Sequence, residues 1–312
     1  MEATPIGQLL FYFPDKFKKQ LSQIREDGLE EIHVRVHQPI QLVTHGKDRL
    51  LYPKDGADLP TSRDLQDLTA RLCGQSLYAH MEELSRGFLS LPGGYRVGVA
   101  GRCVHQQKGE TAIKEVSSVN IRIPRSVPGQ VEEMLPFLYR EGRLSSTLIL
   151  SPPACGKTTF LRELIRLIST GNVHGSGQRV GVADTRFELA GMAGGIPAFD
   201  LGPRTDVRSG GEKGEALLAL LLAMSPEVLA TDEIGRPEEA EAAISASLSG
   251  VVFLATAHGD SLSTLACRPD IRRLILQGLF ERFVILSRRQ GPGTIEAVLD
   301  RNGKKLYDGE GV

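Results

Sequence analysis

Residues 151–159 form a short stretch whose residue types suit phosphate binding. The expected loop comprises Ser151, Pro152, Pro153, Ala154, Cys155, Gly156, Lys157, Thr158 and Thr159. Glycine lets the backbone approach a phosphate closely, and the amides at a helix N-terminus point towards an anion. Lys157 is spaced to reach the β- and γ-phosphates, and the Thr158 hydroxyl is spaced to bind Mg²⁺. Because a strand pattern precedes the loop and a helix pattern follows it, we expect a nucleotide site rather than an ordinary turn.

Two carboxylates follow a second apolar run. Val228–Thr231 leads directly into Asp232 and Glu233. At a strand end, Asp232 can hold the metal or its water, and Glu233 can polarise the attacking water. An Asp-Glu pair opening a surface loop is common, but its place after a phosphate loop in an α/β pattern favours the catalytic interpretation.

Three more residues are candidates at or beyond strand ends. His258 follows the apolar run Val251–Thr256 and is predicted to sense the γ-phosphate, although a lone histidine is more often structural. Asp184 either orients water or metal, or caps a helix, and its pattern leaves both open. Arg204 is a hypothetical catalytic arginine that acts within the chain or on a neighbouring subunit; most arginines are merely solvated. The pattern does not rank four further arginines, Arg96, Arg102, Arg122 and Arg125.

An α/β domain is needed to position these residues. Short apolar runs predict strands at Thr147–Leu150, Val180–Ala183, Val228–Thr231, Val251–Thr256 and Arg282–Leu286, with helices such as Phe160–Ile168 and Glu238–Leu248 between them. Four of the runs are apolar throughout, as in parallel strands buried on both faces. Ligand chemistry is then expected at the carboxyl ends of the strands.

The first half of the chain has a different pattern. Alternating apolar and polar residues predict strands around residues 30–44 and a hairpin over 88–104 that turns at Pro92-Gly93-Gly94. A helix is expected from Thr61 to Gly74, with Thr61 and Asp64 spaced as a capping box. We therefore expect an α+β domain over residues 1–125, a linker or domain crossing over 126–143, and a nucleotide-binding domain over 144–312.

Composition narrows the classes of function. The 312 residues carry 37 basic and 38 acidic side chains, and Trp is absent. This balance does not favour a protein that coats nucleic acid or stacks bases. The four cysteines lack paired spacing, the N-terminus does not resemble a secretory signal, and the best apolar stretch, Ala216–Met224, is too short to cross a bilayer. We expect a cytoplasmic protein without a membrane span.

The motifs together resemble the stage III sporulation protein AA family, P-loop ATPases of endospore-forming bacteria that are similar to secretion and pilus ATPases. The resemblance spans nearly the whole chain. It is carried by EIHVRVHQPIQL, SLYAHMEELSRGFLSLPGGYRVGVAGRCV, SVNIRIPR, SPPACGKTTFLRELIR, DLGPRTDV, MSPEVLATDEIGRPEEAEA, TAHG and FERFVILSRR.

The resemblance implies a RecA-like P-loop ATPase core, ATP and Mg²⁺ as ligands, and a ring, expected to be a hexamer, that works with membrane proteins of a sporulation channel. Such a protein would be peripheral at the inner membrane, on the mother-cell side. By position, residues 156–158 match the phosphate loop, Asp232 and Glu233 the Walker B pair, and His258 the histidine box. Asp184, Arg186 and Glu188 match the acidic segment.

The chain departs from the family pattern at two segments. Ser151 and Ala154 stand where the phosphate loop usually has its outer glycines, although serine also occurs at the first position. Thr185 and Phe187 replace a glutamate and a serine of the acidic segment. These departures weaken the prediction of hydrolysis more than that of binding. Two alternatives therefore stay open: an ATP-binding scaffold with little turnover, and a RecA-like motor on nucleic acid, for which the chain offers no added binding module.

Overall fold

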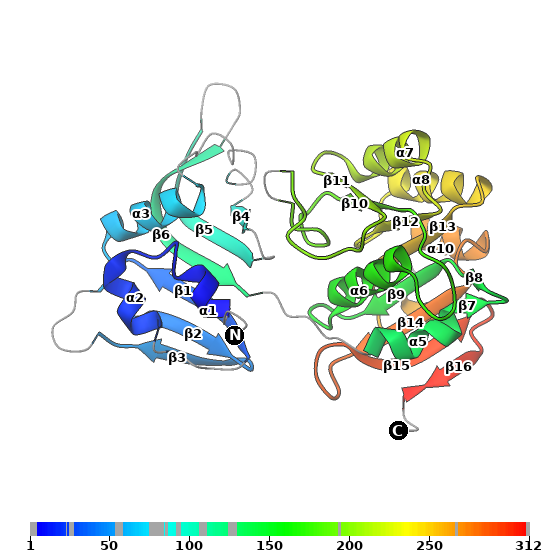
Figure 1. The fold of residues 1–312 in the computed structure, drawn as a ribbon, viewed down its shortest axis with the longest axis horizontal. Helices are drawn as coiled ribbons and strands as arrows, with labels where there is room; N and C mark the ends of the chain where they lie inside the picture. The colour runs from blue at the N-terminus through cyan, green and yellow to red at the C-terminus, as the bar shows by residue number, and fades with distance from the viewer. Residues whose placement is uncertain are drawn as a thin grey trace. The chain divides into compact units, whose positions relative to one another are not determined.

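The computed structural model describes residues 5–22, 24, 28–53, 59–74, 84, 87–91, 95–105, 111–123, 130–192, 195–265 and 268–309. The chain divides into two compact units, Met1–Arg125 and Ser126–Val312 (Figure 1). Among the described residues, no helix combines the length and the apolar character that crossing a bilayer requires.

The first unit is a six-stranded antiparallel sheet with helices on one face. Its strands are β1 (Leu29–Arg35), β2 (Ile40–Thr44), β3 (Lys47–Leu51), β4 (Phe88–Leu91), β5 (Tyr95–His105) and β6 (Thr111–Arg122), in the order β3-β2-β1-β6-β5-β4. Its helices are α1 (Pro5–Leu9), α2 (Asp15–Leu21) and α3 (Ser62–Leu72). Alternate strand residues, such as Ile32 and Val34, pack with the helices in one core. The expected hairpin is β4–β5, but its turn at residues 92–94 lies outside the described residues.

Helix α3 begins with the expected capping box. The Thr61 amide donates to the Asp64 carboxylate at 2.7 Å, and the Asp64 amide donates to the Thr61 hydroxyl at 3.3 Å. These reciprocal bonds satisfy two amides that lack partners within the helix.

The second unit is a mixed eight-stranded sheet. Its strands are β9 (Thr147–Ser151), β10 (Val180–Asp184), β11 (Thr205–Ser209), β12 (Val228–Thr231), β13 (Val252–His258), β14 (Arg282–Ser287), β15 (Thr294–Asp300) and β16 (Lys305–Asp308). The order is β11-β10-β12-β13-β9-β14-β15-β16, parallel from β11 to β14 and antiparallel beyond. The five strands expected from apolar runs are all present, and the β9, β10 and β12 runs are buried throughout.

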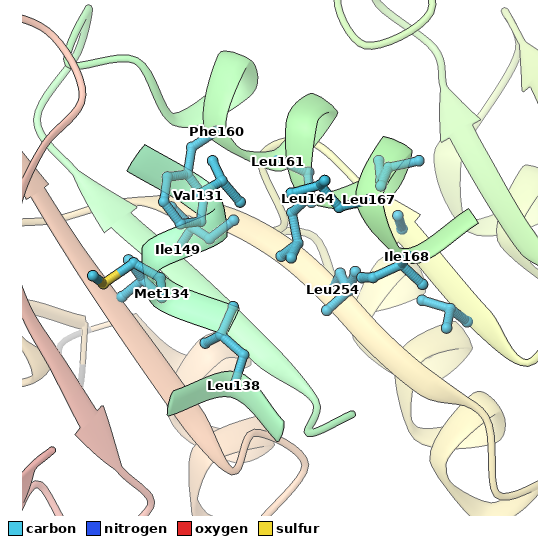
Figure 2. Packing of buried hydrophobic residues seen from close by; sticks show 14 of the residues in the cluster. Val131, Met134, Leu138, Ile149, Phe160, Leu161, Leu164, Leu167, Ile168 and Leu254 are labelled. Carbon is cyan, nitrogen blue, oxygen red and sulfur yellow. The ribbon is translucent and has the colours of Figure 1, made fainter. Parts of the chain in front are cut away.

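Helices cover both faces of this sheet. Helices α5 (Gln130–Leu138) and α6 (Lys157–Thr170) pack on one face, and α7 (Lys213–Ala223), α8 (Pro237–Leu248) and α10 (Pro269–Leu276) pack on the other. The short helix α9 (Leu262–Leu265) follows β13. Figure 2 shows Leu161, Leu164 and Ile168 of α6 packed over the strands that carry Ile149 and Leu254. This packing holds the N-terminal end of α6 at the carboxyl edge of β9.

The segment expected to link the domains differs from the prediction. Its described part begins at Gln130 and forms α5, followed by a two-stranded sheet of β7 (Tyr139–Arg140) and β8 (Arg143–Leu144). The α5 side chains of Val131, Met134 and Leu138 are buried in the core of the second unit. Their spacing is that of an amphipathic helix, which the nearby proline and glycine residues obscured in the sequence.

Candidate nucleotide-binding site

The expected phosphate loop joins β9 to α6. Gly156 precedes the helix with a φ of 89°, a conformation in which glycine carries no Cβ penalty. A Cβ there would lie 3.0 Å from the backbone nitrogen of Gly293, and the Gly293 amide donates to the Cys155 carbonyl at 2.9 Å. The loop is therefore seated against the turn between β14 and β15. A side chain at position 156 would be strained by the backbone angle and crowded by the Gly293 backbone.

The remaining loop residues show what the departures from the family pattern do. Ala154 has a φ of 58°, in the region where a non-glycine residue is disfavoured. Pro152, Pro153 and Ala154 are exposed, whereas Cys155 is buried. Ser151 ends β9 fully buried, and its hydroxyl donates to the Pro152 carbonyl at 2.7 Å. Thr159 lies in the first turn of α6. The loop thus forms without its outer glycines, with backbone strain at position 154.

Lys157 points its ammonium group into the loop. Lys157 is 7% exposed. Its Nζ donates to the carbonyls of Ser151 and Pro152 at 3.3 and 3.2 Å and to the Ser151 hydroxyl at 3.3 Å. Burial lowers the Lys157 pKa, and the negative charge of Asp232 opposes this shift. A buried ammonium held by weak carbonyl contacts is suited to an incoming anion.

Thr158 and Asp232 meet across the carboxyl edge of the sheet. The Thr158 hydroxyl donates to Asp232 Oδ2 at 2.7 Å. The buried Thr256 hydroxyl donates to the other oxygen, Oδ1, and accepts the backbone N–H of Glu233 at 2.8 Å. Thr256 therefore fixes both acidic residues. In the sequence, the only sign of this role is a hydroxyl at the end of the apolar run Val251–Thr256.

The oxygen atoms of Thr158 and Asp232 fit a magnesium ion. Mg²⁺ takes hard oxygen ligands, commonly one or two protein groups together with water and substrate phosphates. Within the described part of the chain, no three His, Cys, Asp or Glu side chains cluster as a metal site. Thr158 and Asp232, whose oxygen atoms lie 2.7 Å apart, are the residues that would hold the ion.

Glu233 directly follows Asp232 with its backbone in the left-handed region, at a φ of 52°. One carboxylate oxygen, Oε1, lies 3.2 Å from His258 Nε2. The other, Oε2, contacts the guanidinium of Arg186. The side chain is thus held from two sides.

His258 connects Glu233 to the phosphate loop. Its Nδ1 atom lies 3.1 Å from Lys157 Nζ. Burial, followed by the charges of Lys157 and Arg268, lowers the His258 pKa. We infer a neutral imidazole that accepts from the ammonium at Nδ1 and donates to the carboxylate from Nε2, because only this tautomer satisfies both contacts.

Lys213 also supports the two acids, although its sequence context does not indicate this. Its Nζ donates to the carbonyls of Asp232 and Glu233 at 2.6 and 2.8 Å and lies 3.5 Å from Glu239 Oε1. Burial lowers its pKa, and the Glu239 carboxylate opposes the shift. Lys213 thus holds the backbone beneath the two acids. A lysine in the first turn of a helix carries no sequence sign of burial.

Asp184 has its carboxylate occupied by backbone donors. Its Oδ1 accepts amides of Glu188 and Leu189 at 2.8 and 3.2 Å, and its Oδ2 accepts amides of Ala190 and Gly191 at 2.8 and 3.3 Å. The residue is 2% exposed, and burial raises its pKa. The expectation of helix capping is wrong, because residues 185–192 form a loop and not a helix. Asp184 instead anchors this loop after β10, and its carboxylate is taken up by the loop amides.

Arg162 of α6 braces the same loop from the other side. Its guanidinium donates to the carbonyls of Leu189 and Glu188 at 2.9 and 2.6 Å and lies 3.5 Å from the centre of the Phe199 ring. Burial lowers its pKa to about 10. The loop that carries Arg186 is therefore fixed to both the sheet and α6.

Arg204 does not join these residues within the chain. Its guanidinium donates to the carbonyls of Ser169 and Thr170 at 2.9 and 3.4 Å, and its amide donates to the Ser169 hydroxyl at 2.7 Å. These contacts cap the C-terminus of α6, about 20 Å along the helix from Lys157 at 1.5 Å per residue. The expectation of an arginine that acts within the chain is corrected: the arginine brought to the site is Arg186.

The unranked arginines belong to the first unit. Arg96 lies over the Phe88 ring at 4.4 Å, while Arg102 and Arg122 pair with Glu115 and Glu31 at 3.6 and 3.5 Å. Arg125 lies outside the described residues.

A mostly parallel sheet covered by helices on both faces, with a strand–loop–helix connection from β9 to α6, has the RecA-like fold of the secretion and pilus ATPases. The pilus retraction motor PilT, solved with bound ADP, superposes with a TM-score of 0.59 at 18% identity, covering 93% of this chain and 82% of that one. The Legionella pneumophila ATPase DotB gives a TM-score of 0.52 at 15% identity, covering 82% and 71%.

Sequence comparison defines the family. The family described as "Sporulation stage III, protein AA" matches residues 13–306. The stage III sporulation protein AA of Bacillus subtilis (strain 168) is 39% identical over 310 residues, which cover 98% of this chain and 99% of that protein. The chain belongs to the stage III sporulation protein AA family. A more distant relative, the uncharacterized protein ycf45 of Cyanidium caldarium, is 33% identical over 52% of this chain and 48% of its own length.

Proposed function

We propose that the protein binds ATP with Mg²⁺ at the loop of residues 151–159 and hydrolyses the terminal phosphate. One observation carries the proposal: the phosphate-loop residue Thr158 is hydrogen-bonded at 2.7 Å to Asp232, the first acid of the second motif. Two motifs that lie far apart in the sequence thus meet at one sheet edge, as nucleotide hydrolysis requires.

Each residue has a separable task in this proposal. Lys157 and the amides of the loop bind phosphate oxygens, while Thr158 and Asp232 hold the metal. A bound Mg²⁺ would neutralise charge on the phosphates. Glu233 accepts a proton from the attacking water, with His258 orienting its carboxylate and linking it to Lys157. Thr256 and Lys213 keep the two acids in place.

We also propose where this activity is used. Membership of a sporulation family, together with the fold of secretion and pilus ATPases, supports a motor or assembly ATPase of a sporulation channel. The protein would form a ring, expected to be a hexamer, on the cytoplasmic, mother-cell face of the membrane and bind membrane proteins of the channel. Light scattering after size exclusion, with and without ATP and Mg²⁺, tests the ring; a strict monomer under every condition would contradict it.

Hydrolysis is tested by phosphate release from the purified protein. We expect steady-state release that depends on Mg²⁺ and is abolished in Glu233→Gln, which retains nucleotide binding. Lys157→Ala should weaken ATP binding by roughly tenfold or more, because charged hydrogen bonds to phosphate are lost. Wild-type release no greater than that of Glu233→Gln would exclude the enzyme.

An ATP-binding scaffold with little turnover is the second candidate. The observation that favours it is the use of Asp184 by four backbone amides, together with Thr185 in place of the usual acid. In that case ATP would be bound and would change the assembly state without phosphate release above the Glu233→Gln level.

A further inference from the structure

Arg186 reaches the candidate site from the loop after β10. Its guanidinium contacts Glu233 Oε2, opposite the side on which His258 approaches Oε1. The loop itself is held by Asp184 from the sheet and by Arg162 from α6. The backbone of Arg186 is thus held in place, while its side chain is 56% exposed and its guanidinium can move.

The Glu233 carboxylate has a charged partner in this arrangement. Its oxygens each receive one donor, His258 at Oε1 and Arg186 at Oε2, and each oxygen keeps a second acceptor site. Activating water requires a carboxylate oxygen within hydrogen-bond reach of that water. A guanidinium paired with a carboxylate makes that carboxylate a poorer proton acceptor. Departure of Arg186 would therefore favour the role of Glu233 as a base, and the exposed arginine is freer to move than His258.

A guanidinium binds carboxylate and phosphate oxygens through the same planar fork. Arg186 therefore has a second class of partner at this site, the terminal phosphate of a nucleoside triphosphate. That phosphate would lie near Lys157, which reaches Glu233 through a single histidine.

Resting on the proposed function, we propose that Arg186 exchanges partners when ATP binds, leaving Glu233 for the γ-phosphate. The exchange makes and breaks no covalent bond. It frees Oε2 of Glu233 to accept a hydrogen bond from water, and it places the positive charge of Arg186 beside the γ-phosphate, where it stabilises the negative charge of the transferring group. Arg186 then takes the part that the sequence had suggested for Arg204, and it distinguishes ATP from ADP.

The ion pair between Arg186 and Glu233 contributes little to the stability of the fold. Exposed ion pairs contribute little to folding because solvent screens them and side-chain entropy opposes them. Removal of Arg186 should accordingly leave the melting temperature nearly unchanged, which allows binding and turnover to be compared in folded protein.

The test measures equilibrium binding of Mg²⁺-ADP and of the Mg²⁺ complex of the β,γ-imido ATP analogue to four proteins. These are the wild type, Arg186→Ala, Arg186→Lys and the control Arg179→Ala, which removes another exposed arginine–glutamate pair of the same unit, with Glu227. For Arg186→Ala we expect ADP affinity within about twofold of wild type and analogue affinity lower by roughly tenfold to a hundredfold. Arg186→Lys should lie between, since lysine keeps the charge without the fork.

The outcomes separate this inference from the proposed function. If the wild type binds both nucleotides and Arg186→Ala binds them with an unchanged ratio of affinities, the partner exchange is wrong while nucleotide binding stands. If the wild type binds neither nucleotide, both proposals fail. A selective loss of analogue binding in Arg186→Ala, absent from Arg179→Ala, supports the exchange.

Discussion

His258 Nδ1 lies 3.1 Å from Lys157 Nζ, while its Nε2 lies 3.2 Å from Glu233 Oε1. One imidazole thus touches both the residue expected to bind phosphate and the residue expected to activate water. The parallel register of β9 and β13, which pairs Ser151 with His258, places the ring beside the loop. A change at the phosphate loop can therefore reach the carboxylate through one side chain.

Stability should depend on the protonation of His258. Its pKa is lowered in the folded state, so the unfolded chain binds more protons as the pH falls below the ordinary histidine value of about 6.5. The contribution of the neutral ring is present above that pH and is lost as the pH falls towards the lower, folded-state pKa. We expect the free energy of unfolding to fall less between pH 7 and pH 5 in His258→Gln than in wild type. Urea denaturation across this range measures the difference, with His174→Gln as control; identical slopes in wild type and His258→Gln would contradict the assignment.

Ala154→Gly should stabilise the protein by about 1 kcal/mol. The native φ of 58° disfavours alanine by about 1–2 kcal/mol, and the greater unfolded-state entropy of glycine offsets part of that gain. Ala223→Gly, at the exposed end of α7, should change stability in the opposite direction because glycine disfavours a helix. Chemical denaturation of both variants decides the point; a less stable Ala154→Gly would show that the loop is not strained.

Arg204→Ala should destabilise the protein by about 1 kcal/mol and leave ATP turnover nearly unchanged. The guanidinium binds the last carbonyls of α6, where a cation also interacts favourably with the helix dipole. Arg208→Ala, on the strand β11 that begins just after Arg204, provides the control, because Arg208 is likewise exposed. A large loss of turnover confined to assembled protein, with normal stability, would instead show that Arg204 acts on a neighbouring subunit.

Lys213→Met should lower the free energy of unfolding by about 3 kcal/mol. The substitution leaves the buried Glu239 carboxylate without its cation and leaves the carbonyls of Asp232 and Glu233 without a donor. The exposed lysine of the Lys305–Asp308 pair offers the matched variant Lys305→Met, for which we expect less than about 0.5 kcal/mol. Equal effects of the two substitutions, measured by denaturation, would show that burial of Lys213 does not matter for stability.

The sequence allowed the fold of the second unit to be predicted where strands are buried on both faces. The sequence runs of β9, β10 and β12 are mostly apolar and buried throughout, so the pattern predicts them as strands in the observed order along the chain. Strand β11 was missed because it lies at the sheet edge and its residues, Thr205–Ser209, are mostly polar and partly exposed. Its pairing with β10, rather than an apolar pattern, makes it a strand.

The sequence predicts those site residues whose type and position in the chain are seldom found for other reasons. A Gly-Lys-Thr tripeptide after a strand and an Asp-Glu pair at a strand end point to the same edge of the sheet. The contributions of Thr256 and Lys213 depend on which backbone atoms lie opposite their side chains, and those are set by strand register and helix packing. The difference between Arg186 and Arg204 arises in the same way: one loop turns towards Glu233, while Arg204 lies against the end of α6.

The left-handed backbone at Glu233 has a consequence for selection. Glycine or asparagine would adopt its φ of 52° at lower cost than glutamate, as glycine would at Ala154. A screen that rewards thermal resistance alone should therefore collect substitutions at both positions. At position 154 the substitution would relieve backbone strain in the loop. At position 233 it would also relieve strain but would remove the carboxylate proposed to activate water. Heat tolerance and activity should therefore diverge among the selected variants.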